Sequence, residues 1–286
     1  MLMKSGLVVI ALILAALLVL FGLRLLDARA DRQVWRDLEH RAVEGPRFDP
    51  AMLDGLPEPA ARFFRFAIAP GTRLRSVAVV EMGGSLSLGD REAPSPQPIV
   101  ARQILAPPHG FIWQVRLESA ARVTGSDAHT PELSWGRFRL LDLVPVARVS
   151  GDPDHLRSSF GRMVGEGLFW TPAAFLAETQ AGWDHLSWEA VDAGTARVTV
   201  RRSGLEQTAD ITVDGEGRPV RVVFPRWSNE NADRQYRVQP FGGDLAGFES
   251  FDGYTLPTRV TGGNHYGTAL YHPFYKAEVT AIHFSE

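Results

Sequence analysis

The longest apolar run of the sequence lies at its N-terminus. Residues 5–23 contain no charged side chain and are rich in Leu, Val, Ile and Ala. A helix over this range is about 28 Å long at about 1.5 Å per residue, which matches the thickness of a bilayer core. We therefore predict a single transmembrane helix over residues 5–26.

A second helical pattern with a narrower apolar side follows over residues 30–43. Val34, Trp35 and Leu38 fall on that side, and Gly45-Pro46 ends the pattern. Trp is enriched at the level of lipid headgroups. The pattern predicts a juxtamembrane helical stalk over residues 27–48.

Helical spacing continues briefly and then gives way to alternation. Asp49-Pro50 is a helix start, and Pro59 opens a helix with apolar residues at 60, 63, 64 and 67. From residue 76 the period becomes two, and Gly and Pro separate successive runs as antiparallel hairpins require. The predicted strands cover residues 76–82, 99–105, 111–118, 122–126, 135–141, 186–191, 196–202, 207–213, 220–225, 235–241, 247–251, 255–261 and 275–284.

One helical insert interrupts these strands. Asp152 or Ser150 can cap a helix that has Pro153 in its first turn and continues to Thr171-Pro172. A short helix over residues 173–178 follows. No repeat of fixed period is present. The pattern predicts a mainly β (α+β) fold with one strongly curved antiparallel sheet, or half-open β-barrel, and helices on its concave face, in one domain over residues 49–286.

Composition narrows the possible partners. The formal net charge is -3, from 30 basic and 33 acidic residues, so no global field attracts nucleic acid. Cysteine is absent, which removes disulfides, thiolate nucleophiles and sulfur-based zinc sites. The expected partner is a membrane, with a lipid or another hydrophobic small molecule as a possible ligand.

The N-terminal segment leaves the compartment open. Ala28-Arg29-Ala30 fits a signal-peptidase site after Ala30, but the apolar stretch is longer than a signal peptide needs, which favours an uncleaved anchor in the bacterial inner membrane. We expect an extracytoplasmic domain. The arginines after the apolar stretch (24, 29, 32, 36 and 41) oppose this placement, because positive charge favours the cytoplasmic side.

The sequence contains none of the common catalytic or nucleotide-binding motifs, which favours a non-catalytic protein without a cofactor. His265 and His272 could approach each other across a hairpin, but no third ligand stands at a suitable spacing, so no metal site is predicted.

The candidate ligand-binding residues centre on the helical insert. Arg162, Glu166 and Trp170 are spaced i, i+4, i+8 and share one helix face. Arg162 can hold an anionic head group while Trp170 contacts an acyl chain; the alternative is a salt bridge that fixes the helix over the sheet. Trp227, near the Gly242-Gly243 pair, can line a cleft or fill the core.

Several spaced motifs resemble an uncharacterised family of bacterial membrane-anchored proteins of unknown function, over residues 55–286. They are residues 101–107, Phe111-Ile112-Trp113, Gly161-Arg162 with Glu166 and Trp170, Pro225-Arg226-Trp227, and residues 251–258. The resemblance adds Trp113 to the candidate site. It implies no activity.

The strands, the helical insert and the ending over residues 253–260 are also similar in architecture to periplasmic lipoprotein carriers, whose half-barrel holds acyl chains beneath a helical lid. Three functions remain open. The first is a membrane-tethered module that binds a lipid, an acyl chain or another hydrophobic ligand without chemistry. The others are a structural docking module of the cell envelope and a hydrolase of unrecognised type using Glu166 and Arg162.

Overall fold

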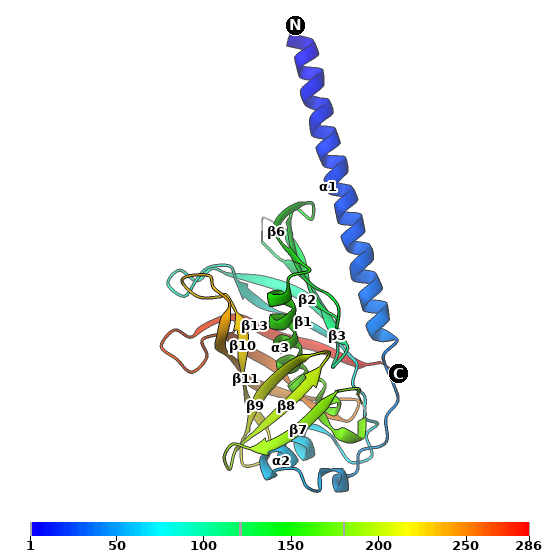
Figure 1. The fold of residues 1–286 in the computed structure, drawn as a ribbon, viewed down its shortest axis with the longest axis vertical. Helices are drawn as coiled ribbons and strands as arrows, with labels where there is room; N and C mark the ends of the chain where they lie inside the picture. The colour runs from blue at the N-terminus through cyan, green and yellow to red at the C-terminus, as the bar shows by residue number, and fades with distance from the viewer. Residues whose placement is uncertain (1, 120–121, 180, 286) are drawn as a thin grey trace.

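The computed structural model describes residues 2–119, 122–179 and 181–285 (Figure 1). A long helix, α1 (Leu2–Glu39), projects from a body built on one curved antiparallel sheet of 13 strands. The sheet contains β1 (Ala78–Ser87), β2 (Pro96–Ala106), β3 (Gly110–Leu117), β4 (Val123–His129), β5 (Ser134–Leu140), β6 (Val144–Ser150), β7 (His185–Ala190), β8 (Thr195–Arg202), β9 (Leu205–Val213), β10 (Pro219–Ser228), β11 (Arg237–Phe251), β12 (Tyr254–Asn264) and β13 (His272–Phe284).

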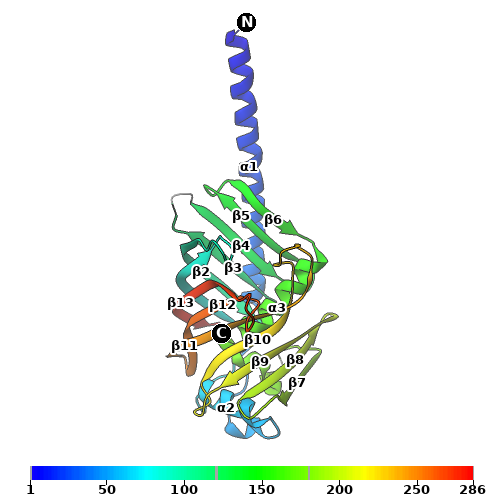
Figure 2. The same ribbon diagram turned by 90° about the vertical axis from the view of Figure 1, so that its left-hand side faces the viewer.

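The sheet consists of two antiparallel meanders, β1 to β6 and β7 to β13, which are joined by the pairing of β1 with β13. The strand order runs β6-β5-β4-β3-β2-β1-β13-β12-β11-β10-β9-β8-β7, so the first and last strands pair and the edges are β6 and β7. Helix α3 (Pro153–Trp170) connects these two edges and packs on strands from both halves, chiefly β10 and β9 (Figure 2). The predicted mainly β fold with one curved sheet and covering helices is confirmed.

The main core lies between the concave face and the remaining helices. Helix α2 (Glu58–Ala67) presents Phe63, Phe64 and Ala67 to this core, all at most 1% exposed. Short 3₁₀ turns, η1 (Pro50–Leu53), η2 (Pro172–Phe175) and η3 (Ala177–Thr179), close the same end of the molecule. The helix predicted over residues 173–178 is therefore a pair of 3₁₀ turns.

A second core lies on the opposite face of the sheet, beneath α1. Leu38 is 3% exposed and packs with Ile104, Ile112 and Trp135, while Val34 and Trp35 border this cluster. The apolar side of the predicted stalk thus packs on the sheet. The helical spacing predicted correctly which residues form the apolar side of this helix. It did not predict what that side contacts, because a sheet face and a layer of lipid headgroups both favour apolar residues there.

Two strands depart from the prediction. β6 was missed because Pro145 was read as a break, yet β6 is an edge strand, where a proline removes no ladder hydrogen bond that the sheet needs. The prediction has two separate strands, over residues 235–241 and 247–251, where the structure has the single strand β11, which continues through Gly242-Gly243 and pairs with β12 from Phe241 to Phe251.

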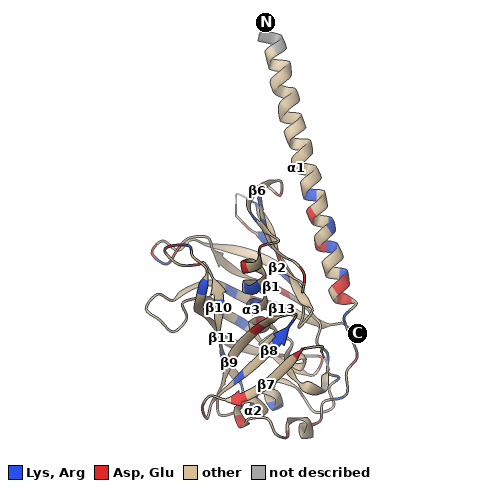
Figure 3. Ribbon diagram, viewed as in Figure 1, with Lys and Arg blue, Asp and Glu red and all other residues tan. Residues whose placement is uncertain are grey.

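One described helix is long and apolar enough to cross a membrane, and it is α1. Residues 5–23 of α1 contain no charged side chain, and charged residues follow where the helix runs alongside the sheet (Figure 3). The division into an anchor (5–26), a stalk (27–48) and a domain (49–286) stays a prediction.

Candidate functional site

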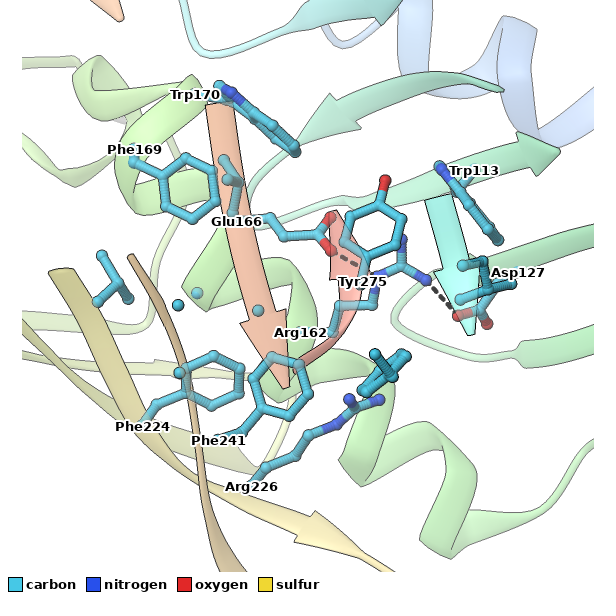
Figure 4. Close-up of a pocket in the computed structure, with 18 of the residues that line it drawn as sticks. Trp113, Asp127, Arg162, Glu166, Phe169, Trp170, Phe224, Arg226, Phe241 and Tyr275 are labelled. Carbon is cyan, nitrogen blue, oxygen red and sulfur yellow. Dashed lines mark hydrogen bonds and ion pairs between the residues drawn. The ribbon is translucent and has the colours of Figure 1, made fainter. Parts of the chain in front are cut away.

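A pocket of about 230 Å³ lies between α3 and the concave face of the sheet (Figure 4). Four charged residues line it, and the rest of the lining is aromatic, aliphatic or glycine. The lining residues are Leu86, Trp113, Asp127, Phe138, Arg162, Gly165, Glu166, Phe169, Trp170, Val222, Phe224, Arg226, Phe241, Gly242, Gly243, Val260, Gly262, Phe274 and Tyr275.

Helix α3 brings the first group of these side chains to the pocket. Asp152 caps its first turn, because the Asp152 carboxylate accepts a hydrogen bond from the Asp154 backbone N–H at 2.8 Å. Glycines then let the helix approach the sheet closely. A Cβ at Gly165 would lie 2.3 Å from Phe224 Cε1, so only glycine permits this packing distance.

Arg162 and its two carboxylate partners form the polar centre of the pocket. The Arg162 guanidinium donates from Nε to Glu166 at 2.7 Å and from Nη1 to Asp127 at 2.5 Å. Gln103 Nε2 donates to the second Glu166 oxygen at 2.7 Å. Burial alone lowers the pKa of Arg162, but the charges of Glu166 and Asp127 outweigh it and the pKa is raised.

Arg226, from β10, is the second cation of the pocket and has fewer partners. Within the described residues its side chain makes one hydrogen bond, from Nε to Ser158 Oγ at 3.3 Å, and no ion pair. Its guanidinium carbon lies 4.8 Å from the centre of the Phe241 ring. Burial lowers the pKa of Arg226, and the nearby charge of Arg162 lowers it further. Arg226 is half-buried, and it lines the pocket.

Aromatic rings form the remaining wall. Phe224 and Phe241 lie 5.3 Å apart between ring centres, and Phe274 extends the row at 6.1 Å from Phe241. On the other side, Trp113 meets Tyr275 edge-on at 6.1 Å. Burial and then the charge of Glu166 raise the pKa of Tyr275, which keeps its hydroxyl protonated. The wall is thus uncharged and apolar.

The structure brings four of the five predicted binding residues together. Arg162, Glu166, Trp170 and Trp113 all line the pocket. Trp227 lies elsewhere: its indole N–H donates to Asp154 at 2.8 Å, and its ring stacks on Tyr236 at 6.3 Å. Trp227 therefore holds the start of α3 to β10. Whether the other four bind a ligand stays a prediction.

Two charged lining residues, Asp127 and Arg226, were missed. Asp127 lies one residue beyond the strand predicted over 122–126. For Arg226 a signal was available: Val222 and Phe224 point to the pocket, and in a strand the residue two positions further faces the same side. The same alternation turns Trp227 away from the pocket.

A serine, a histidine and an aspartate also meet beside the pocket. Ser134 Oγ lies 2.8 Å from His155 Nδ1, and His155 Nε2 lies 3.7 Å from Asp127 Oδ1. Ser134 is 1% exposed and does not belong to the pocket lining, so a ligand in the pocket cannot reach its hydroxyl.

Burial lowers the pKa of nearby His129 to about 3, helped by the charge of His155, so His129 is neutral near pH 7. Among the described residues no group of three or more His, Asp or Glu side chains is arranged to hold a metal ion.

Comparison with known sequences identifies the family. The model for a family of unknown function, DUF6544, matches residues 46–277. The chain belongs to this family. The resemblance to a family of unknown function, predicted from the spaced motifs, is confirmed. Among proteins with curated descriptions, none matches the chain.

The solved structures that align with this chain are distant from it in sequence. A LolA superfamily protein from Nitrosomonas europaea aligns with a TM-score of 0.41 and 10% identity, over 80% of this chain and 92% of its own. A DUF1329 family protein from Desulfovibrio piger aligns with a TM-score of 0.38 and 11% identity, over 83% of this chain and 94% of its own. Similarity at this level says nothing about what this chain binds.

Proposed function

We propose that this protein is a membrane-tethered, non-catalytic module that binds one end of an anionic amphiphile in the pocket beneath α3. The observation that carries the proposal is the lining itself: an aromatic wall closes around Arg226, a cation without an ion-pair partner among the described residues. A ligand with an acyl chain and a negatively charged head group satisfies both parts of this lining.

The size of the pocket limits what enters it. A cavity of about 150 Å³ with apolar walls is large enough to bind benzene. The pocket here is about 230 Å³. It is smaller than the roughly 300 Å³ at which pockets for drug-sized molecules begin. A segment of one acyl chain with its head group fits, whereas an entire phospholipid extends out of the pocket.

The head group belongs to Arg226 rather than to Arg162. Arg162 already makes hydrogen bonds to Asp127 and Glu166, so an additional anion would have to displace a buried carboxylate. Arg226 faces no such competition, and its depressed pKa marks a cation that gains from a negative partner. The alternative given above, a salt bridge that fixes α3 over the sheet, describes the role of Arg162 and Glu166.

Chemistry at Glu166 has less support from the geometry. Both Glu166 carboxylate oxygens accept hydrogen bonds, one from Arg162 and one from Gln103. A hydrolase also needs an activated nucleophile, but the pocket lining contains no serine, threonine, cysteine or histidine, and its Asp127 carboxylate is paired with Arg162. The hydrolase alternative therefore ranks below binding.

Cross-linking in membranes tests the proposal. The full-length protein in its membrane is incubated with a fatty acid that carries a photoreactive diazirine on the chain, irradiated and digested for mass spectrometry. We expect labelled peptides from the pocket wall around Phe169, Phe224 and Phe241, and also from α1, which contacts bulk lipid. Labelling confined to α1 would overturn the proposal.

A cavity-filling variant sharpens the test. A Cβ at Gly262 would meet its nearest atom, the Gly242 carbonyl oxygen, at 3.5 Å, so Gly262→Leu fits the backbone and fills the pocket. We expect it to lose the pocket labels and to keep those on α1. Gly83→Leu is the matched control, because Gly83 is outside the lining and its added Cβ meets only the Ile99 carbonyl oxygen at 3.6 Å.

A further inference from the structure

Helix α1 lies on the outer face of the sheet, and the hairpin formed by β5 and β6 runs alongside it (Figure 1). Ion pairs join the two in a regular order. Asp31 of α1 contacts Arg137 at 3.7 Å, and Asp27 contacts Arg137 at 3.3 Å, Arg139, and Arg148 at 2.5 Å.

The last of these pairs joins Arg24 to Asp142, in the turn of the hairpin. As the hairpin advances from Arg137 to Asp142, its partners on α1 therefore retreat from Asp31 to Arg24. The hairpin points along α1 toward the apolar N-terminal part of the helix, and its turn lies level with Arg24.

Arg24 is also the residue at which the apolar stretch of α1 meets its first charge. Residues 5–23 have no charged side chain, and the most apolar 18-residue window of the helix is not covered by the body. If this stretch crosses a bilayer, then Arg24 lies at the bilayer surface, and the hairpin turn lies there with it.

The tip of the hairpin is apolar where it is most exposed. Leu141, Val144 and Val146 are 61%, 42% and 57% exposed. A single exposed apolar residue on a soluble surface needs no explanation, but three within six positions, held at the end of a membrane-spanning stretch, form a patch suited to the boundary between headgroups and acyl chains.

We propose that the β5–β6 tip inserts into the interfacial layer of the same bilayer that α1 crosses. The inference rests on the membrane anchoring in the proposed function but not on ligand binding. The tip gives the body a second point of attachment, which fixes the orientation of the sheet on the membrane.

The second attachment also shortens the path from the bilayer to the pocket. Phe138 of β5 lines the pocket, and Leu141 at the tip follows three residues later. At about 3.3 Å per residue the two are roughly 10 Å apart along the strand. An acyl chain that leaves the bilayer at the tip thus reaches the pocket edge without crossing a long exposed surface.

Depth measurements on the full-length protein test the inference. The chain has no cysteine, so a single introduced cysteine can carry an environment-sensitive fluorophore without background labelling. Leu141→Cys and Val146→Cys report on the tip. Val191→Cys is the matched surface control, because Val191 is 46% exposed and follows β7, which lies at the opposite end of the body (Figure 1). Leu14→Cys reports on α1.

In vesicles of phosphatidylcholine and phosphatidylglycerol, we expect a spin label near the lipid headgroup to quench the fluorophores at residues 141 and 146 but not that at residue 191. A spin label deep in the acyl chains should quench the fluorophore at residue 14. Tip emission that is unquenched, while residue 14 is quenched, overturns the insertion of the tip and leaves the anchor standing. Loss of quenching at residue 14 overturns the anchor, and the insertion with it.

Discussion

Two arginines in one pocket have different roles because their neighbours differ. Arg162 lies between two carboxylates, with 15% of its side chain exposed, and removing it would leave Asp127 and Glu166 without the cation that pairs with both of them. Arg226 has no carboxylate partner among the described residues, so its removal breaks no ion pair. We therefore expect substitution of Arg162 to affect stability, and substitution of Arg226 to affect the proposed ligand affinity.

This difference predicts opposite outcomes for two matched substitutions. Arg162→Gln should lower the free energy of unfolding by about 3–5 kcal/mol, the usual effect of breaking a buried ion pair. Arg226→Gln should cost much less stability and weaken labelling by an anionic fatty acid about tenfold, equivalent to ~1.4 kcal/mol for one charge-assisted hydrogen bond. Denaturant unfolding and photolabelling measure the two effects.

A fatty alcohol of the same chain length is the control for Arg226→Gln, because it lacks the negative charge. Its labelling should be unchanged in the variant. An equal loss for acid and alcohol would mean that Arg226 shapes the pocket rather than binding the head group.

The candidate residues could be predicted from the sequence only where spacing within one element decides their position. Arg162 and Glu166 are neighbours on any helix, so their pairing followed from i, i+4 spacing. The pairing of Arg162 with Asp127 joins α3 to β4, and the sequence has no signal for which strand lies beneath a given helix turn.

At the scale of elements, α3 packs closely on the sheet because glycines of the helix, which have no side chain, receive side chains from the strands. Gly165 receives Phe224, and Gly161 receives the side chain of Gln207, whose Oε1 would lie 2.7 Å from an added Cβ. The sequence showed glycines inside a helix, which lowers helix propensity by about 1 kcal/mol each. The close approach that compensates for this cost depends on the positions of β9 and β10, which the sequence does not indicate.

Gly165→Ala should therefore destabilise the protein although alanine favours helices. The clash with Phe224 costs about 1–3 kcal/mol as overpacking, against a gain of about 1 kcal/mol in helix propensity. Thermal or denaturant unfolding measures the result. In a double-mutant cycle, Phe224→Leu should relieve part of the penalty, so that the two changes together cost less than their sum. Strict additivity would contradict the packing argument.

At the scale of the whole molecule, α1 is attached to the sheet at two places. The apolar cluster around Leu38 holds its C-terminal end, and the arginine cluster around Asp27 holds it near the apolar stretch. Two attachments along a rigid helix define one orientation, whereas a single attachment allows the helix to pivot. Asp27 is 5% exposed and contacts three arginines, so it is the critical residue of the second attachment.

Asp27→Ala should thus release the attachment near the apolar stretch, because Arg137, Arg139 and Arg148 lose the carboxylate that they share and then repel one another. With spin labels on Leu14→Cys and Val191→Cys in the full-length protein, pulsed electron resonance should show a broader distance distribution between helix and body. Asp37→Ala removes a negative charge from an exposed position of the same helix and should leave the distribution narrow. Equal widths in both variants would contradict two-point attachment.

The pairing of β1 with β13 has a consequence for how the protein is made. Ala78 pairs with Phe284, so the centre of the sheet joins segments that are 206 positions apart (284 − 78). During synthesis, β1 leaves the ribosome long before β13, so the β1 edge that β13 covers in the finished sheet stays unpaired while almost all of the other strands are made. The growing chain therefore carries an open strand edge in the place where the mature sheet is most protected, and this edge must be shielded from other chains until β13 is made.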